Sequence, residues 1–156
     1  MPDPLALITS DQMLAHWQGH RRLTRRVIEA FPEEELFSFS VGGMRPFGKL
    51  VGEMLRMAVP SLEGIVSRTW QDYEAPTPTS KEELLAAWDQ GTERIEELWP
   101  QIPAGRFQEE DTAFGMWPGP VHYLFLYAVE NEIHHRAQGY VYLRALGIEP
   151  PAFYER

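Results

Sequence analysis

The sequence Asn131-Glu132-Ile133-His134-His135-Arg136-Ala137-Gln138 lies in a long amphipathic segment near the C-terminal end of the chain. It places two adjacent histidines, an arginine, a carboxylate and two amides within little more than two helical turns. We predict one continuous helix here, from about Gly119 to Leu146. Gly147 is a typical residue just after a helix end, and Pro150-Pro151 cannot continue a helix. A helix of this length must pack against others, so this segment predicts a helical fold.

One face of this helix is expected to point into the core. At about 100° per residue, six side chains lie within about 80° of one another. They are Leu124, Ala128, Asn131, His135, Gln138 and Tyr142. Three of the six are polar, which is unusual for a core face and needs a reason. His134 points aside from this stripe.

Three more segments show the same helical periodicity. Their predicted limits are Ser10 to Ala30, Pro46 onward with a kink or split at Pro60, and Ser80 to Pro100. Residues 33–45 and 74–80 are predicted loops, and residues 101–118 are irregular with a short extended piece near 106–111. A chain of 156 residues can bury one core. We therefore predict an all-α fold, a single four-helix bundle domain over residues 1–156.

The composition limits the classes of function. The formal charge of −9 argues against a nucleic-acid partner, which requires a basic surface. The one basic cluster, Arg21-Arg22 and Arg25-Arg26, is interpreted as a solvated helix face. Arg136 and Arg144 are expected to reach acids at the surface or in loops. No Gly-rich phosphate loop or nucleophile elbow is present.

The chain contains no cysteine, which excludes disulfides and thiolate metal sites and is compatible with a cytoplasmic location. No apolar run approaches the roughly 20 residues of a membrane span. Residues Met1 to Pro4 lack a basic region followed by a long apolar run, so we expect no signal peptide.

The polar stripe suggests a metal site. Asn131 and His135 are four residues apart, so they project side by side and could hold one ion. Glu53, at the edge of an inward stripe on another helix, is the best-placed third ligand, and His20 on the first helix is the reserve. The alternative is that these groups are buried and hydrogen-bonded to one another. His16 and His20 form a second, less favoured pair.

The run His134-His135-Arg136-Ala137-Gln138, with Tyr142-Leu143-Arg144-Ala145-Leu146-Gly147 and Pro150-Pro151, resembles the C-terminal signature of the DinB/YfiT-like superfamily. That pattern reads His-x-x-His-His-Arg-Gly-Gln, then Tyr-Leu-Arg, Leu-Gly and Pro-Pro. The segment from Phe47 to Glu53 resembles the part that carries the first ligand of the family.

The resemblance implies a bacterial four-helix bundle with up-down-down-up connections that is often a homodimer. It also implies a divalent metal, commonly nickel or zinc, held by three histidines. Characterised members include thiol-dependent transferases, in which the metal lowers the pKa of a bound thiol. Gln138 and His20 are then candidates to contact a cofactor.

This sequence departs from that pattern at two of the three ligands. Glu53 and Asn131 stand where histidines are expected, and only His135 matches. Affinity for nickel or zinc should fall, whereas a harder ion such as manganese accepts oxygen donors. A site without metal, with Glu53 hydrogen-bonded to His135, remains equally open.

Three hypotheses follow. In the first, the protein is a metal enzyme that activates a thiol or water. In the second, the protein has lost its metal and binds a small-molecule ligand or a partner. In the third, it is a dimeric stress-response protein with a structural role.

Overall fold

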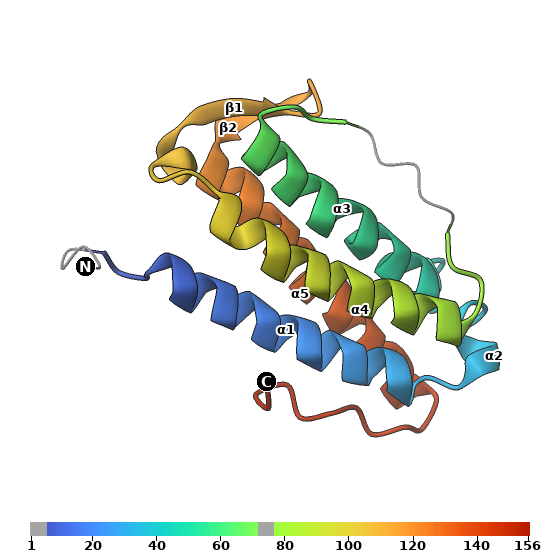
Figure 1. Cartoon of the computed structure of the whole chain (residues 1–156). Helices are drawn as coiled ribbons and strands as arrows, with labels where there is room; N and C mark the ends of the chain where they lie inside the picture. Colours follow the sequence, from blue (N-terminus) through green and yellow to red (C-terminus); the bar gives the residue numbers. More distant parts are fainter. Residues whose placement is uncertain (1–5, 72–76) are drawn as a thin grey trace.

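The computed structural model describes residues 6–71 and 77–156, and four long helices dominate it (Figure 1). These are α1 (Ser10–Ala30), α3 (Phe47–Ser67), α4 (Lys81–Leu98) and α5 (Val121–Ala145). The shorter elements are the helix α2 (Glu33–Leu36), the 3-10 turns η1 (Trp99–Gln101) and η2 (Arg106–Gln108), and the strands β1 (Glu110–Ala113) and β2 (Trp117–Pro120). The predicted all-α four-helix bundle is confirmed. Met1 to Pro4 and residues 74–76 of the predicted loop lie outside the described residues.

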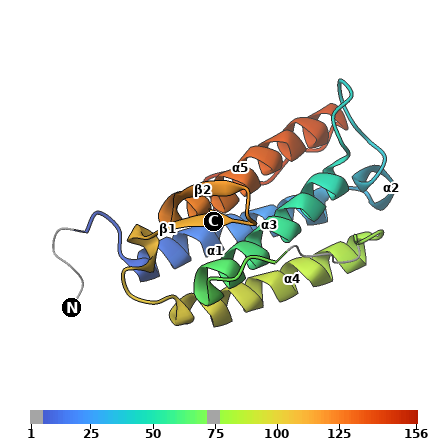
Figure 2. The same cartoon turned by 90° about the horizontal axis from the view of Figure 1, so that it is seen from above.

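The long helices form a ring in the order α1, α5, α3 and α4, in which each packs against two neighbours (Figure 2). Helices α1 and α5 run in one direction and α3 and α4 in the other, as the resemblance implies (Figure 1). Helix α5 therefore lies between α1 and α3 and has two faces toward the protein interior. Within the described part of the chain, no helix is both long and apolar enough to cross a lipid bilayer.

The helix ends follow the local sequence closely. Thr9, one residue before the predicted helix start at Ser10, forms a capping box with Gln12 at the start of α1. Ser80, the predicted start of the third long helix, caps α4 by accepting a hydrogen bond from the amide of Glu83, and the Glu83 carboxylate accepts one from the amide of Thr79. After α5, Gly147 adopts a φ of 76°, and the amides of Gly147 and Ile148 donate to the carbonyls of Arg144 and Leu143. This is a Schellman ending, which favours glycine at that position.

Several predicted limits need correction. Helix α3 continues through Pro60 from Phe47 to Ser67, so the predicted split does not occur. The extended piece predicted near 106–111 lies at β1, because Arg106 begins a 3-10 turn. Strand β1 pairs antiparallel with β2, and β2 includes the residues just before Val121. Helix α5 therefore begins at Val121 and not at the predicted Gly119.

The core consists of two apolar clusters at opposite ends of the bundle, separated by a polar layer. One cluster includes Phe31, Phe47, Trp88 and Tyr142, and the other includes Trp17, Trp99 and Phe125. On α1 and α5 most of the buried residues between the clusters are polar; among them are His20, Arg21, Thr24, Asn131, Glu132, His135 and Arg136. This layer contains the candidate functional residues.

Candidate functional site

Helix α5 carries a different polar group on each of its two inward faces. Asn131 and His135 face α3, whereas Glu132 and Arg136 face α1. Residues four apart, such as Asn131 and His135 or Glu132 and Arg136, lie on the same side of a helix. Neighbours in sequence, such as Asn131 and Glu132, are about 100° apart around the helix axis, so the two pairs face different helices.

On the α3 side, Glu53 joins two of the predicted ligands through one oxygen. Its Oε1 accepts hydrogen bonds from Asn131 Nδ2 at 3.1 Å and from His135 Nε2 at 3.0 Å. Its Oε2 accepts from Arg45, and His135 Nδ1 lies 2.7 Å from Gln138 Oε1. The structure therefore brings Glu53, Asn131, His135 and Gln138 together, in the hydrogen-bonded arrangement that the sequence left as an alternative to metal.

The charge on Glu53 is stabilised by these neighbours. Burial alone would raise the pKa of this carboxyl, but the hydrogen bonds from Arg45, His135 and Asn131 outweigh that effect and lower the pKa to about 2. The side chain remains 27% exposed and that of Arg45 is 52% exposed, so solvent screens the pair and its contribution to stability is modest.

We expect Glu53→Gln to lower the free energy of unfolding by about 1 kcal/mol at pH 7. The pKa of Glu53 is depressed in the folded state, so its contribution is complete above the ordinary value of 4.5 and is lost as the pH falls through about 2. The difference between wild type and variant should therefore narrow between those two pH values. Urea unfolding followed by circular dichroism from pH 2 to pH 7 measures it, and a difference that stays constant with pH would contradict the assignment.

The donor set does not fit the nickel or zinc site of the resembled family. It provides one imidazole nitrogen, one carboxylate and one amide, and the amide is a weak ligand. Arg45 also places a positive charge against Glu53. Among the described residues, no group of three or more histidine and acidic side chains has a geometry that could hold a metal ion.

His20, the predicted reserve ligand, lies on the other side of α5. It is buried, and its Nδ1 lies 3.0 Å from Arg136 Nη2. Its Nε2 lies 2.9 Å from Arg156 Nη1 and 3.1 Å from His16 Nε2. Burial, followed by the charges of Arg136, Arg156 and His16, lowers the pKa of His20 to about 4. His20 is therefore a neutral imidazole near pH 7, and it does not join Glu53 and His135.

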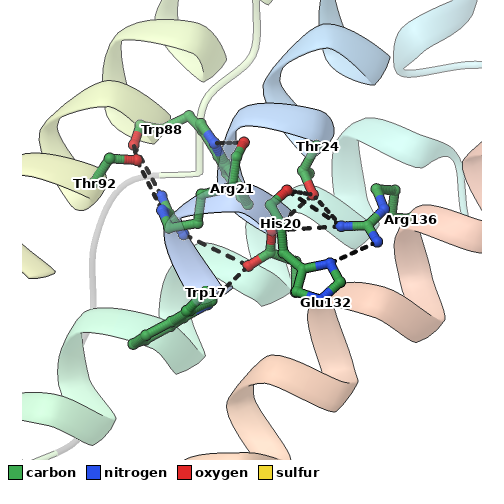
Figure 3. Close-up of polar contacts among 8 residues, drawn as sticks. All are labelled: Trp17, His20, Arg21, Thr24, Trp88, Thr92, Glu132 and Arg136. Carbon is green, nitrogen blue, oxygen red and sulfur yellow. Dashed lines mark hydrogen bonds and ion pairs between the residues drawn. The ribbon is translucent and has the colours of Figure 1, made fainter. Parts of the chain in front are cut away.

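A buried carboxylate, Glu132, is the centre of the polar layer on the α1 side (Figure 3). Its Oε2 accepts from Trp17 Nε1 at 3.1 Å, and its Oε1 accepts from Thr24 Oγ1 at 2.7 Å. Arg21 Nη1 and Arg136 Nη1 each lie 3.9 Å from this carboxylate. One buried anion thus neutralises two buried cations in part.

The predicted exposure of Arg21 and Arg136 is wrong. Arg21 is 1% exposed, stacks 3.9 Å from the ring centroid of Trp88 and donates to Trp88 O and Thr92 Oγ1. Burial lowers its pKa to about 10, against the opposing effect of Glu132. The sequence held a signal for this, since Arg21 lies four residues after the buried Trp17 on the same side of α1.

Comparison with known proteins adds the family. The DinB family model matches residues 1–156. A DinB-like protein from Bacillus subtilis has a similar structure, with a TM-score of 0.73, 20% identity, and coverage of 93% of this chain and 99% of that one. A DinB-like protein from Bacillus cereus has a TM-score of 0.69, 19% identity, and coverage of 92% and 97%. No protein with a curated description matches this chain.

Proposed function

Since the chain belongs to the DinB family, we propose that it is a metal-independent member of that family that acts as a binding protein for a small-molecule ligand. In this proposal a carboxylate–imidazole pair, Glu53 and His135, takes the place of the metal site. The observation that supports it is that both oxygens of Glu53 and both ring nitrogens of His135 already contact protein groups.

The same observation argues against catalysis by this pair. A general base must offer a free lone pair within hydrogen-bond reach of the substrate proton. The two ring nitrogens of His135 face Glu53 and Gln138, and Glu53 is further held by Arg45 and Asn131. His135 or Glu53 could accept a proton from a substrate only if at least one of these contacts were broken.

Metal analysis of protein purified without an affinity tag tests the proposal. We expect less than about a tenth of an equivalent of nickel, zinc or manganese after each is offered and excess ion is removed, because the site lacks two strong nitrogen donors. The matched variant Asn131→His restores one nitrogen donor and should raise zinc retention. One equivalent of metal in the wild-type protein that disappears in both His135→Ala and Glu53→Ala would refute the proposal.

A metal-dependent enzyme with thiol or hydrolytic chemistry is the second candidate, and one observation favours it. Asn131 Oδ1 is buried and has no hydrogen-bond partner among the described residues. This oxygen lies on the side chain that contacts Glu53, and two oxygens with one imidazole suit manganese better than zinc. Manganese that is retained by the wild type and lost in Asn131→Leu would favour this candidate over the first.

We also propose that the protein is a homodimer through the outer face of α5. Tyr123, Tyr127 and Val141 are at least half exposed there, and Trp117 of β2 is also exposed. Exposed apolar side chains grouped on one helix face are typical of interfaces between subunits. We expect a dimer mass in sedimentation equilibrium and a monomer mass for Tyr127→Asp. A monomeric wild type would contradict this proposal.

The absence of cysteine supports a cytoplasmic location within the same proposal. A role in a bacterial stress response rests on the family resemblance alone.

A further inference from the structure

A shallow pocket of about 470 Å³ lies where the segment after α5 returns along α1 (Figure 1). Four arginines and one glutamate line it; they are Arg22, Arg25, Arg26, Arg156 and Glu155. This concentration of positive charge is unusual in a chain whose formal charge is −9. The pocket is on the α1 side of the bundle, separate from Glu53 and His135.

Two of the arginines already have acidic partners. Arg25 donates to Asp89 at 2.7 and 2.9 Å, and Arg26 contacts the backbone and carboxylate of Glu155. Arg22 and Arg156 therefore supply most of the charge available to a ligand.

Arg22 and Arg156 converge over Gly19 of α1. A Cβ atom at that glycine would lie 3.2 Å from Arg156 Cβ and 3.7 Å from Arg22 Nη2. The missing side chain at position 19 thus allows both cationic side chains to approach the same point of the helix. An anion bound beside this turn of α1 would be attracted by both positive charges.

The contacts of His20 show a surplus of hydrogen-bond donors at this point. Both of its ring nitrogens face guanidinium groups, Arg136 on one side and Arg156 on the other. A neutral imidazole has one lone pair and one N–H, so it can accept from only one of them. The second guanidinium faces the N–H group of the His20 ring, which cannot accept a hydrogen bond. That guanidinium therefore has no acceptor on the ring.

We propose that Arg22 and Arg156, with Arg26 at the rim, form a binding site for a small oxyanion of the phosphate class, such as a phosphomonoester. Planar guanidinium groups bind tetrahedral oxyanions through paired, charge-assisted hydrogen bonds. The net negative charge of the whole chain repels an extended polyanion such as an anionic membrane, but a small dianion interacts mainly with the local arginines. This site is independent of the function proposed for Glu53 and His135.

Titration of the full chain with inorganic phosphate tests the proposal. Amide shifts are followed by NMR at constant ionic strength, with chloride as the balancing anion. We expect saturable shifts at residues of α1 beside the pocket, with one phosphate per chain. Arg22→Ala and Arg156→Ala should each weaken binding about tenfold, because each removes a charge-assisted contact. Gly19→Ala should also weaken binding, since it displaces Arg156 without a change in charge.

Arg94→Ala is the matched control. Arg94 is exposed on α4, where it pairs with Glu63 and Glu97, and its loss changes the net charge by the same amount. Equal weakening in this control and in Arg22→Ala would show a general charge effect and overturn the proposal, as would shifts that never saturate. Vesicles that contain phosphatidic acid distinguish a lipid headgroup from a free phosphate compound. Vesicle binding without saturable phosphate binding would also overturn it.

Discussion

Replacement of Glu132 by leucine is expected to lower the free energy of unfolding by about 3–5 kcal/mol, the typical loss when one partner of a buried ion pair is removed. The carboxylate is 2% exposed and lies between Arg21 and Arg136, which are themselves buried. Without it, the two guanidinium groups remain in the interior with no acidic side chain of the described residues within 4 Å, and only the more distant Asp89 opposes the charge of Arg21. Trp17 Nε1 also loses its acceptor, whereas Thr24 Oγ1 can still donate to the carbonyl of His20. Urea unfolding at pH 7 measures the loss.

The control for this prediction is Glu130→Leu on the same helix. Glu130 is exposed, so its replacement removes the same charge from the chain without leaving a buried group unpaired, and we expect a change within about 0.5 kcal/mol. Glu132→Gln keeps an oxygen acceptor and should fall between the two. Losses of similar size for Glu130→Leu and Glu132→Leu would mean that the buried network contributes little.

Alanine at Gly139 is expected to cost about 2–3 kcal/mol, near the upper end of the usual range for an overfilled core. Its Cβ would lie 2.5 to 2.8 Å from three atoms of the Phe47 ring at the start of α3. That ring stacks on Phe31 with centroids 4.7 Å apart and both are buried, so it has little room to move. The clash would separate α3 from α5 at the end of the bundle that carries Arg45 and Glu53.

Gly52→Ala is the matched control for Gly139→Ala. Gly52 lies in the second turn of α3, and among the described residues its added Cβ would meet only Thr77 Cγ2, at an ordinary distance of 3.6 Å. Helix propensity alone should then stabilise the protein by up to about 1 kcal/mol. Thermal unfolding compares the two variants, and stabilisation by both would show that Phe47 adapts.

The periodicity of α5 predicted that Asn131 and His135 project side by side, and the stripe of α3 placed Glu53 near them; in the structure both residues contact Glu53. Both predictions are consequences of helical geometry within single segments. The same reasoning placed Arg21 and Arg136 at the surface, because it assumed that each helix has one inward face. Helix α5 has two, since α1 and α3 pack on different sides of it. Glu132 is buried because α1 packs against the second of these faces.

By itself, the sequence determined where the long helices lie, how most of them end and that they form a bundle, because caps, breakers and apolar spacing act over a few residues. It also placed three polar residues on the core face of α5. The tertiary structure was needed to show which polar groups meet: Glu53 with Arg45 and His135, Glu132 with Arg21 and Arg136, and His20 with Arg156. Arg136 and Glu132 are four residues apart, and Arg45 and Glu53 are eight apart at the start of α3. The other partners are distant in the chain and meet through the packing of whole helices. A buried charge is stable only beside a partner, so these pairings depend on the fold as a whole.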